Sequence, residues 1–300
     1  MPTFFVVSGY FSLLIFDRYG PRRFLALRMQ RLVLPFLATL LTVNVMQEWF
    51  LARFVQSQIF SSSAGVEHLW FLGYLILYVL AVWVSLGSYD WSRVAVPILE
   101  RVVNGRFCLL RLYLVFIVAF AVLRFVQREL GIGYITFLGF IDSTELINYS
   151  LYFIVGLISF RSRIIYLAIS RPEPIGSLLM ATFAALVLSD LPRSIGASNA
   201  WYEIVSQSAS FFGAITCIGL SRLLFSESTR VSRFFSDASY TIYLFHHALV
   251  IVFAWVLISL AWSPVAKFFV VIMLCLVTTS CLHIFLISRV SMLRLFFNGK

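Results

Sequence analysis

Long apolar runs separated by short, arginine-bearing turns dominate this chain of 300 residues. Hydrophobic residues make up 61% of the sequence and charged residues only 12%, and the mean hydropathy is +0.95. A chain this apolar cannot keep its surface in water as a soluble globule, whereas a bilayer-spanning helix needs about 20 mostly apolar residues. The composition therefore predicts an all-α fold, a polytopic helical bundle in a membrane.

Nine runs are long enough, or nearly so, to cross the hydrocarbon core of a bilayer. They lie near residues 2–16, 32–52, 69–87, 108–125, 149–160, 175–190, 202–225, 239–260 and 265–288. The first and fifth are short, and the fifth would need residues from the 131–140 stretch to enter the membrane. Because no soluble domain interrupts the runs, we expect a single membrane-embedded domain over residues 1–300.

The distribution of lysine and arginine predicts the orientation. If the turn after the first run is cytoplasmic, 18 of the 23 basic residues fall on that side and five on the other. We therefore expect a multi-pass protein of the bacterial inner membrane with a cytoplasmic C-terminus. Nine runs then place Met1 outside, so we expect one further span upstream. The net charge is +10, and the basic residues that produce it lie in the turns between the apolar runs. This distribution predicts membrane lipid as a partner and excludes nucleic acid.

The sequence carries no pattern for a metal or a tightly bound cofactor. The four cysteines lie in or beside apolar runs without metal-ligand spacing, and no zinc motif or phosphate-binding loop occurs. We expect no metal site. Ser8-Gly9 lacks the preceding strand of a nucleophile elbow, so we interpret Gly9 as a small residue at which two helices approach closely.

Four arginines follow the first apolar run. Arg28 and Arg31 are three residues apart and share a helix face, with Arg22 and Arg23 one to two turns earlier. Guanidinium groups form paired, charge-assisted hydrogen bonds to phosphate oxygens, such as those of coenzyme A. These four residues are the candidate cofactor-binding set. The alternative is that they set the topology or contact anionic lipid.

Two adjacent histidines occupy the run that starts near Ser239. His246 and His247 would lie about 10 to 12 Å in from the cytoplasmic end of that helix, with Tyr243 one turn before them. Neutral imidazoles at this depth can orient a thioester or relay a proton. With His68, at the start of the third run, they form the candidate catalytic set. Helix-to-helix hydrogen bonding is the alternative for the pair.

A third group of polar and aromatic residues is predicted at the opposite, periplasmic side. Carboxylates and amides accept hydrogen bonds from sugar hydroxyls, and indole rings stack on sugar rings. Tryptophans at a membrane edge also form aromatic belts, which is the alternative. The candidate substrate-binding residues are Asn44, Glu48, Glu67, Trp70, Glu203 and Gln207.

Several of these segments together resemble membrane acyltransferase family 3. The matching segments are Phe4-Phe5-Val6-Val7-Ser8-Gly9-Tyr10-Phe11-Ser12, Arg28-x-x-Arg31 before Pro35, His68-Leu69-Trp70-Phe71-Leu72, and Tyr243-Leu244-Phe245-His246-His247. The resemblance continues to the C-terminal Leu295-Phe296-Phe297-Asn298-Gly299-Lys300. It also implies that the family's first helix, which carries its catalytic histidine, lies upstream of Met1.

The resemblance implies an O-acyltransferase that uses a cytoplasmic acyl-CoA, succinyl-CoA or acetyl-CoA, as co-substrate. The acceptor is then a sugar hydroxyl on the periplasmic face. The similarity is strongest to members that succinylate osmoregulated periplasmic glucan. Three alternatives remain open: an acetyltransferase for another envelope glycan, a carrier of a lipid-linked sugar, and a non-catalytic membrane partner. A carrier should show inverted repeats and broken helices, and the oligomeric state stays open.

Overall fold

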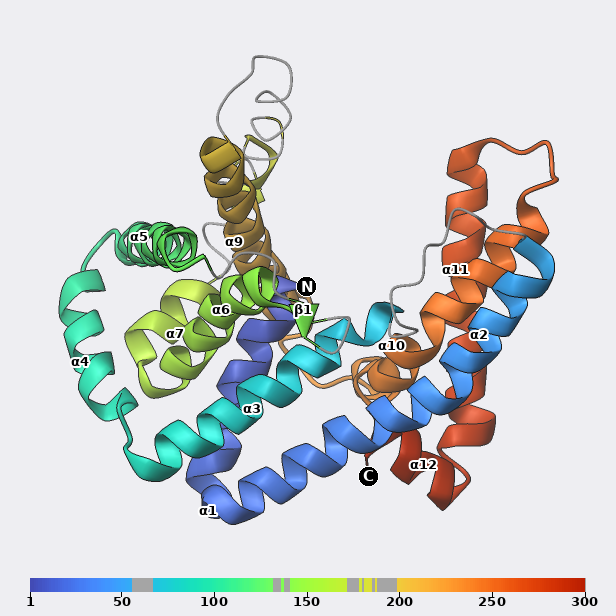
Figure 1. The fold of residues 1–300 in the computed structure, drawn as a ribbon, viewed down its shortest axis with the longest axis horizontal. Coiled ribbons are helices and arrows are strands. Elements are labelled where there is room, and N and C mark those ends of the chain that lie inside the picture. The colour runs from blue at the N-terminus through green and yellow to red at the C-terminus, as the bar shows by residue number, and fades with distance from the viewer. Residues whose placement is uncertain are drawn as a thin grey trace. The chain divides into compact units, whose positions relative to one another are not determined.

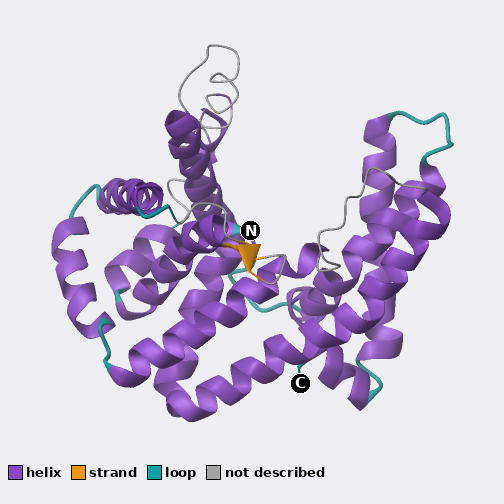
Figure 2. Cartoon of the chain, in the orientation of Figure 1, coloured by secondary structure: helices purple, strands orange, loops and turns teal. Residues whose placement is uncertain are grey.

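The computed structural model describes residues 1–55, 67–131, 136–137, 141–171, 178–179, 181–184, 187 and 199–299. Almost all of these residues are helical (Figures 1 and 2), which confirms the predicted all-α fold. The elements are α1 (Pro2–Thr39), η1 (Leu40–Asn44), α2 (Val45–Phe50), η2 (Leu51–Val55), η3 (Glu67–Leu69), α3 (Trp70–Ser88), α4 (Ser92–Val103), α5 (Cys108–Glu129), β1 (Thr136–Phe137), β2 (Ile141–Asp142), α6 (Ser143–Arg161), α7 (Arg163–Ser170), α9 (Asn199–Leu224), α10 (Arg230–Leu257), α11 (Pro264–Leu282), η4 (His283–Ile287) and α12 (Ser291–Asn298).

Within the described residues, seven helices are long and apolar enough to cross a membrane. They contain eight of the nine predicted runs, because the first two runs form one helical stretch over Pro2–Val55. Its 54 residues would extend about 80 Å, more than twice a hydrocarbon core of about 30 Å. Gly20, with φ +75° and ψ 170°, interrupts the helix between the two runs. The run at 175–190 lies largely outside the described residues.

The fifth run is longer than the apolar pattern indicated. α6 begins at Ser143 rather than near residue 149, because the Asp142 carboxylate accepts hydrogen bonds from the backbone N–H groups of Thr144 and Glu145. The helix then has 19 residues, about the length of one crossing. The expectation that the run is too short without the preceding stretch is therefore wrong.

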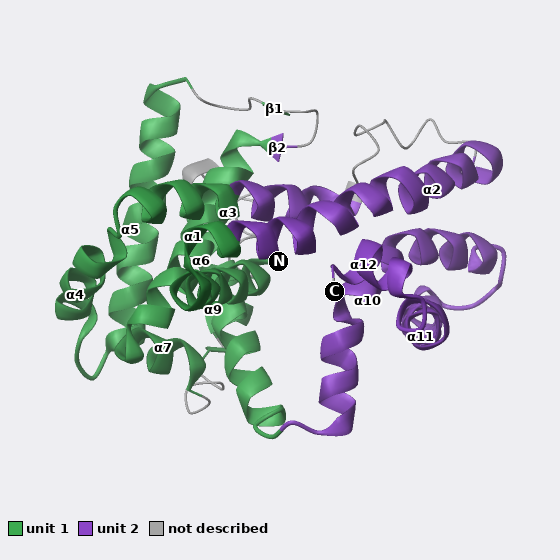
Figure 3. Ribbon diagram, turned by 90° about the horizontal axis from the view of Figure 1, so that it is seen from below, with its two compact units in different colours: residues 1–24, 78–137, 142–227 green, residues 25–77, 138–141, 228–300 purple. Residues whose placement is uncertain are grey.

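The chain divides into two compact units (Figure 3). Unit 1 comprises residues 1–24, 78–137 and 142–227, and unit 2 comprises residues 25–77, 138–141 and 228–300. In unit 1, α1 and α6 touch backbone to backbone at two glycines. A Cβ on Gly9 would lie 2.0 Å from the carbonyl oxygen of Phe153, and one on Gly156 would lie 2.0 Å from that of Val6. The predicted close approach at Gly9 is confirmed.

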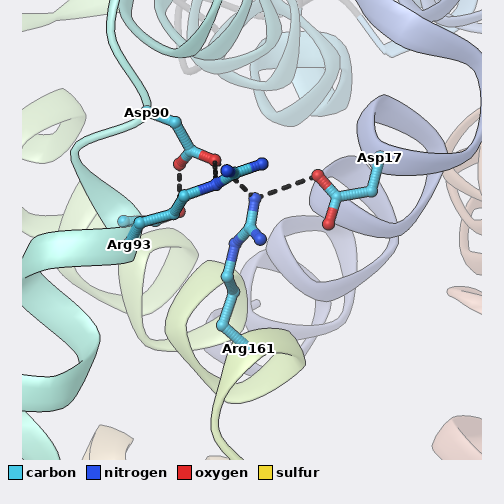
Figure 4. A network of polar contacts seen from close by, with 5 residues as sticks. Asp17, Asp90, Arg93 and Arg161 are labelled. Carbon is cyan, nitrogen blue, oxygen red and sulfur yellow. Dashed lines mark hydrogen bonds and ion pairs between the residues drawn. The ribbon is translucent and has the colours of Figure 1, made fainter.

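An ion-pair network also ties unit 1 together (Figure 4). Arg161, at the end of α6, donates to Asp17 of α1 at 3.0 Å and to Asp90 before α4 at 2.8 Å. Arg93 also donates to Asp90, at 2.9 Å. Burial opposes ionisation of the Asp90 carboxyl, but hydrogen bonding by Ser92 and attraction by both arginines outweigh it and lower its pKa. The network therefore stays ionised at neutral pH.

In unit 2, α10 and α11 pack along one another (Figure 1) and the C-terminal segment joins them. α10 begins with a capping box between Thr229 and Ser232, which satisfies two free N–H groups at its first turn. The Thr241 hydroxyl of α10 contacts His283 Nδ1 at 3.0 Å and donates to Asn298 Oδ1 at 3.3 Å. Three short π-helices, η1, η2 and η4, interrupt the regular helices of this unit, a feature found often near functional sites.

Candidate active site

Three histidines from two separate segments meet in unit 2. His68 lies on η3, directly before α3, and His246 and His247 lie on α10. The rings of His68 and His247 are stacked, with centroids 4.9 Å apart and planes at 21°, and the His246 ring meets the His68 ring edge-on at 5.5 Å. The three residues predicted as catalytic thus form one imidazole cluster.

Two hydrogen bonds fasten η3 to α10. The Tyr243 hydroxyl donates to the carbonyl oxygen of His68 at 2.6 Å, and His68 Nε2 donates to the carbonyl oxygen of Leu244 at 3.1 Å. His68 is only 9% exposed. The backbone and the side chain of His68 are therefore both held against the same turn of α10.

Hydrogen bonding fixes which imidazole nitrogens keep a lone pair. A carbonyl only accepts, so His68 carries its proton on Nε2 and His246, whose Nδ1 lies 2.6 Å from the Tyr243 carbonyl, carries its proton on Nδ1. His247 Nδ1 bonds Gln47 Oε1 at 2.9 Å in the same way. His68 Nδ1 is thus an unprotonated nitrogen, buried and without a hydrogen-bond partner. It can accept a proton.

The depth predicted for the histidine pair needs correction. α10 begins at Arg230, nine residues before the predicted start, because Thr229 caps it there. His246 is sixteen residues from the first residue of α10, about 24 Å, and eleven residues from Leu257, about 16 Å. His247 also contacts His68 and Gln47, so the histidine pair lies at the level of η3 and α2.

Burial of His68 has a measurable consequence. Burial, with a smaller contribution from His247, lowers the His68 pKa to about 4, whereas a histidine in an unfolded chain has a pKa near 6.5. The folded state therefore binds fewer protons than the unfolded state in this range, and its stability falls as the pH is lowered from about 6.5 to about 4.

We expect this loss to reach roughly 3 kcal/mol, because each pKa unit corresponds to about 1.4 kcal/mol. Thermal unfolding of the detergent-solubilised protein, followed between pH 7.5 and 4, measures it. His68→Gln should show a shallower decline because glutamine has no proton to gain. An equally steep decline in wild type and His68→Gln would assign the pH dependence to other groups.

The predicted phosphate-binding arginines differ in their surroundings. Arg28 is partly buried, and its Nε and Nη2 atoms are buried without a hydrogen-bond partner. Arg31 is exposed, and its backbone carbonyl accepts a hydrogen bond from the Tyr240 hydroxyl at 2.8 Å. Tyr240 also lies near enough to Arg28 to interact with it electrostatically. α10 therefore contacts the arginine pair of α1 through Tyr240 and also carries His246 and His247 of the imidazole cluster.

Arg22 and Arg23 lie in unit 1 and are exposed. The Arg23 guanidinium stands over the Tyr19 ring, 5.1 Å from its centroid. Such a cation–π contact leaves the guanidinium N–H groups at its edge accessible. Their role in donor binding stays a prediction.

The C-terminal segment packs onto the backbone of Arg31. Gly299, with φ +62°, follows α12, and a Cβ there would lie 2.6 Å from the Cα of Arg31. The Phe297 ring packs on Phe245 of α10, with centroids 5.1 Å apart. Only glycine tolerates both the left-handed backbone and the close approach. Gly299 therefore lets α12 press against the backbone of Arg31.

The predicted sugar-binding residues of unit 2 do not share one environment. Asn44 and Gln47 are buried, 1% and 3% exposed, whereas Glu48 is exposed. Trp70 packs edge-on against Tyr74, with centroids 5.4 Å apart. The backbone of Glu67 is in η3, and its side chain lies outside the described residues.

Glu203 and Gln207 belong to unit 1, on α9. Arg124 of α5 donates two hydrogen bonds to the Glu203 carboxylate, at 2.6 and 3.0 Å, and Gln207 Oε1 accepts one from the Tyr152 hydroxyl at 2.8 Å. Both side chains are thus anchored between helices of unit 1. Their predicted convergence with the sugar-binding residues of unit 2 stays a prediction.

Two contributors were missing from the predicted site sets. Gln47 binds His247, and Tyr240 binds the Arg31 backbone. A signal for Tyr240 exists in the sequence, because Tyr240, Tyr243 and His247 follow a helical spacing of three and four residues. Within the described part of the chain, no group of three or more His, Cys, Asp and Glu residues is arranged to hold a metal ion.

Comparison with known proteins identifies the family of the chain. A family model described as an acyltransferase domain, that of acyltransferase family 3, matches residues 1–284. Proteins named Glucans biosynthesis protein C from Salmonella dublin, Salmonella enteritidis PT4 and Salmonella choleraesuis are each 29% identical to the chain, over 84% of this chain and 70% of their own length. No solved structure matches it. The chain therefore belongs to acyltransferase family 3 and is a multi-pass membrane acyltransferase.

Proposed function

We propose that this protein moves an acyl group, succinyl, from cytoplasmic acyl-CoA to hydroxyl groups of a periplasmic glucan. The family membership supports acyl transfer, and the names of the relatives support a glucan acceptor. The choice of succinyl as the acyl group and of coenzyme A as its carrier rests on the family resemblance of the Arg28-x-x-Arg31 and histidine segments. The proposed location is the inner membrane, with the C-terminus in the cytoplasm, because 18 of 23 basic residues then lie inside.

One observation carries the proposal: Arg28, with unpartnered donors for an anion, and His68, with an unpartnered acceptor for a proton, both interact with helix α10. Arg28 has buried donor atoms without partners, and it interacts with Tyr240 of α10. Two turns further along α10, about 10 Å, His247 stacks on His68, whose Nδ1 has no partner. An anionic thioester needs a guanidinium for its phosphates and a base or proton relay near its reacting carbonyl.

The proposed reaction balances as a simple acyl exchange. The sugar oxygen attacks the thioester carbonyl carbon, a C–O bond forms, and the C–S bond breaks. The hydroxyl proton passes through the imidazole cluster, with His68 Nδ1 as acceptor, and ends on the departing coenzyme A sulfur. Because its Nε2–H is held by the Leu244 carbonyl, His68 presents the same nitrogen throughout.

Direct transfer tests the function. The purified protein in detergent or proteoliposomes is supplied with periplasmic glucan and succinyl-CoA or acetyl-CoA, and the glucan is analysed by mass spectrometry. We expect succinyl esters on the glucan. Acetyl esters alone would select the acetyltransferase alternative, and no ester with either thioester would contradict acyl-CoA as donor.

Removing the arginine pair should weaken donor use. Each lost charge-assisted hydrogen bond to phosphate is expected to cost about 1.5–3 kcal/mol, so Arg28→Ala with Arg31→Ala should raise the KM for the thioester at least about 100-fold. Membrane insertion and the KM for glucan should stay unchanged. Arg101→Ala, which removes an exposed arginine from α4, is the matched control. An unchanged thioester KM in the double variant would assign the pair to topology.

A further inference from the structure

A second set of polar groups lies in unit 1, where α5 ends and α6 and α9 begin. We call Arg124 and Gln127 of α5, Thr144 and Asn148 of α6, and Glu203 of α9 the polar layer. Three of its members are buried: Gln127 is 4% exposed, Thr144 9% and Asn148 7%. All five belong to helices that qualify as membrane spans.

Contacts along the helices place these residues at one level. α5 runs antiparallel to α9, since Tyr113 bonds Ser208 at 2.8 Å near one end and Arg124 bonds Glu203 at the other. α6 joins at the same register, because Tyr152 bonds Gln207, one turn after Glu203.

Asn148 and Thr144 then lie one and two turns before Tyr152 on the same face of α6, which brings them toward the level of Arg124. Consistent with this, Arg124 interacts electrostatically with Glu145, the residue after Thr144. The polar layer is therefore a local cluster contributed by three helices.

The charges of the polar layer are already paired. Arg124 binds both carboxylate oxygens of Glu203, at 2.6 and 3.0 Å, and donates to Gln127 Oε1 at 3.2 Å. The atoms left without a hydrogen-bond partner are uncharged: Gln127 Nε2, the Thr144 hydroxyl and Asn148 Oδ1. This set offers an amide donor, an amide acceptor and a hydroxyl that can act as either. An uncharged ligand with several hydroxyl groups matches this set of hydrogen-bonding groups.

We propose that the polar layer binds a glucose unit of the acceptor glucan through its hydroxyl groups. The inference rests on the proposed function, because it assigns the acceptor named there to a place in unit 1. Under the orientation predicted from the basic residues, α5 ends and α9 begins at the periplasmic side, where such a glucan is found. Unsatisfied polar groups inside a membrane protein are costly, and the hydroxyl groups of a bound sugar would serve as their partners.

Near-isosteric apolar replacements test the site: Gln127→Leu, Asn148→Leu and, as the smallest change, Thr144→Val. Each removes a neutral hydrogen-bonding group, so we expect the KM for glucan to rise about 5- to 10-fold per residue, with the thioester KM unchanged. Direct binding of purified periplasmic glucan to the solubilised protein, by isothermal calorimetry, should weaken in parallel. Val122→Leu, an exposed position of α5, is the matched control.

The two proposals fail in different ways. Wild-type protein that binds glucan without acylating it would contradict the proposed function and leave the polar layer intact. Wild-type protein that acylates glucan while all three variants keep its KM would overturn the polar layer as a sugar site. A higher melting temperature in those variants, with unchanged glucan binding, would identify the layer as filled by water. If the leucine variants fail to fold, Thr144→Val alone decides the question.

Discussion

Replacing His68 by glutamine should lower the turnover number of acyl transfer by about 10²–10⁴-fold, the usual contribution of one general acid–base group. Glutamine places an N–H donor near the position of the imidazole Nε2, so it can keep the hydrogen bond to the Leu244 carbonyl. It offers no basic nitrogen in place of His68 Nδ1. The measurement is succinyl transfer at saturating thioester and glucan, normalised to folded protein, and KM for the thioester should change little.

A second buried histidine supplies the control. His283 is 7% exposed and contacts the Thr241 hydroxyl, outside the imidazole cluster. His283→Gln should lower stability in detergent while the turnover of the remaining folded protein stays near wild type. If His68→Gln loses activity only in proportion to its folded fraction, the cluster joins η3 to α10 and has no part in proton transfer.

The positions of the helices were largely predictable because a bilayer leaves few options. Each backbone N–H and C=O inside the hydrocarbon must be satisfied within its own helix, so apolar runs of sufficient length become helices. Helix ends were less predictable, because they depend on polar side chains outside the apolar run. Asp142 starts α6 six residues early, and Thr229 starts α10 nine residues early. Both caps were visible in the sequence but carry no hydropathy signal.

The sequence identified the individual catalytic candidates but did not predict how they contact one another. His68, His246 and His247 were selected because imidazoles within or beside membrane spans are rare and costly. Hydropathy assigns each one only a position along its helix, and the early start of α10 lengthened the distance from the first residue of the helix to His246 and His247. Their stacking on His68 depends on how η3 folds against α10, which sequence periodicity does not encode.

The partners of these residues were harder still to find. Gln47 reaches His247 from a stretch where α2 is flanked by η1 and η2, and a π-helix alters which residues face the interior. Asn44 and Gln47 are buried while Glu48 is exposed, although regular α-helical spacing groups all three. The contact between the buried Gln47 amide and His247 therefore becomes apparent only in the structure.

Replacing Gly156 by alanine should prevent stable assembly of unit 1. The new Cβ would lie 2.0 Å from the Val6 carbonyl oxygen and 2.9 Å from the Tyr10 backbone nitrogen, and backbone atoms cannot rotate away as a side chain would. α1 and α6 would have to separate, which disrupts the stacking of Phe5 on Tyr149. Overpacking usually costs about 1–3 kcal/mol, and a clash with backbone belongs at or above the upper end.

We therefore expect Gly156→Ala to reduce the yield of folded protein and its melting temperature in detergent. Gly9→Ala should have the same effect, because its Cβ would lie 2.0 Å from the Phe153 carbonyl oxygen. Gly87→Ala is the matched control, since a Cβ at Gly87 in α3 meets nothing within 4 Å. Alanine is the better helix former by about 1 kcal/mol, so the control should be neutral or slightly stabilised. Equal melting temperatures for Gly156→Ala and Gly87→Ala would show that the packing of α1 against α6 does not require glycine at the contact. The interpretation of Gly9 as a close-approach residue would then be wrong.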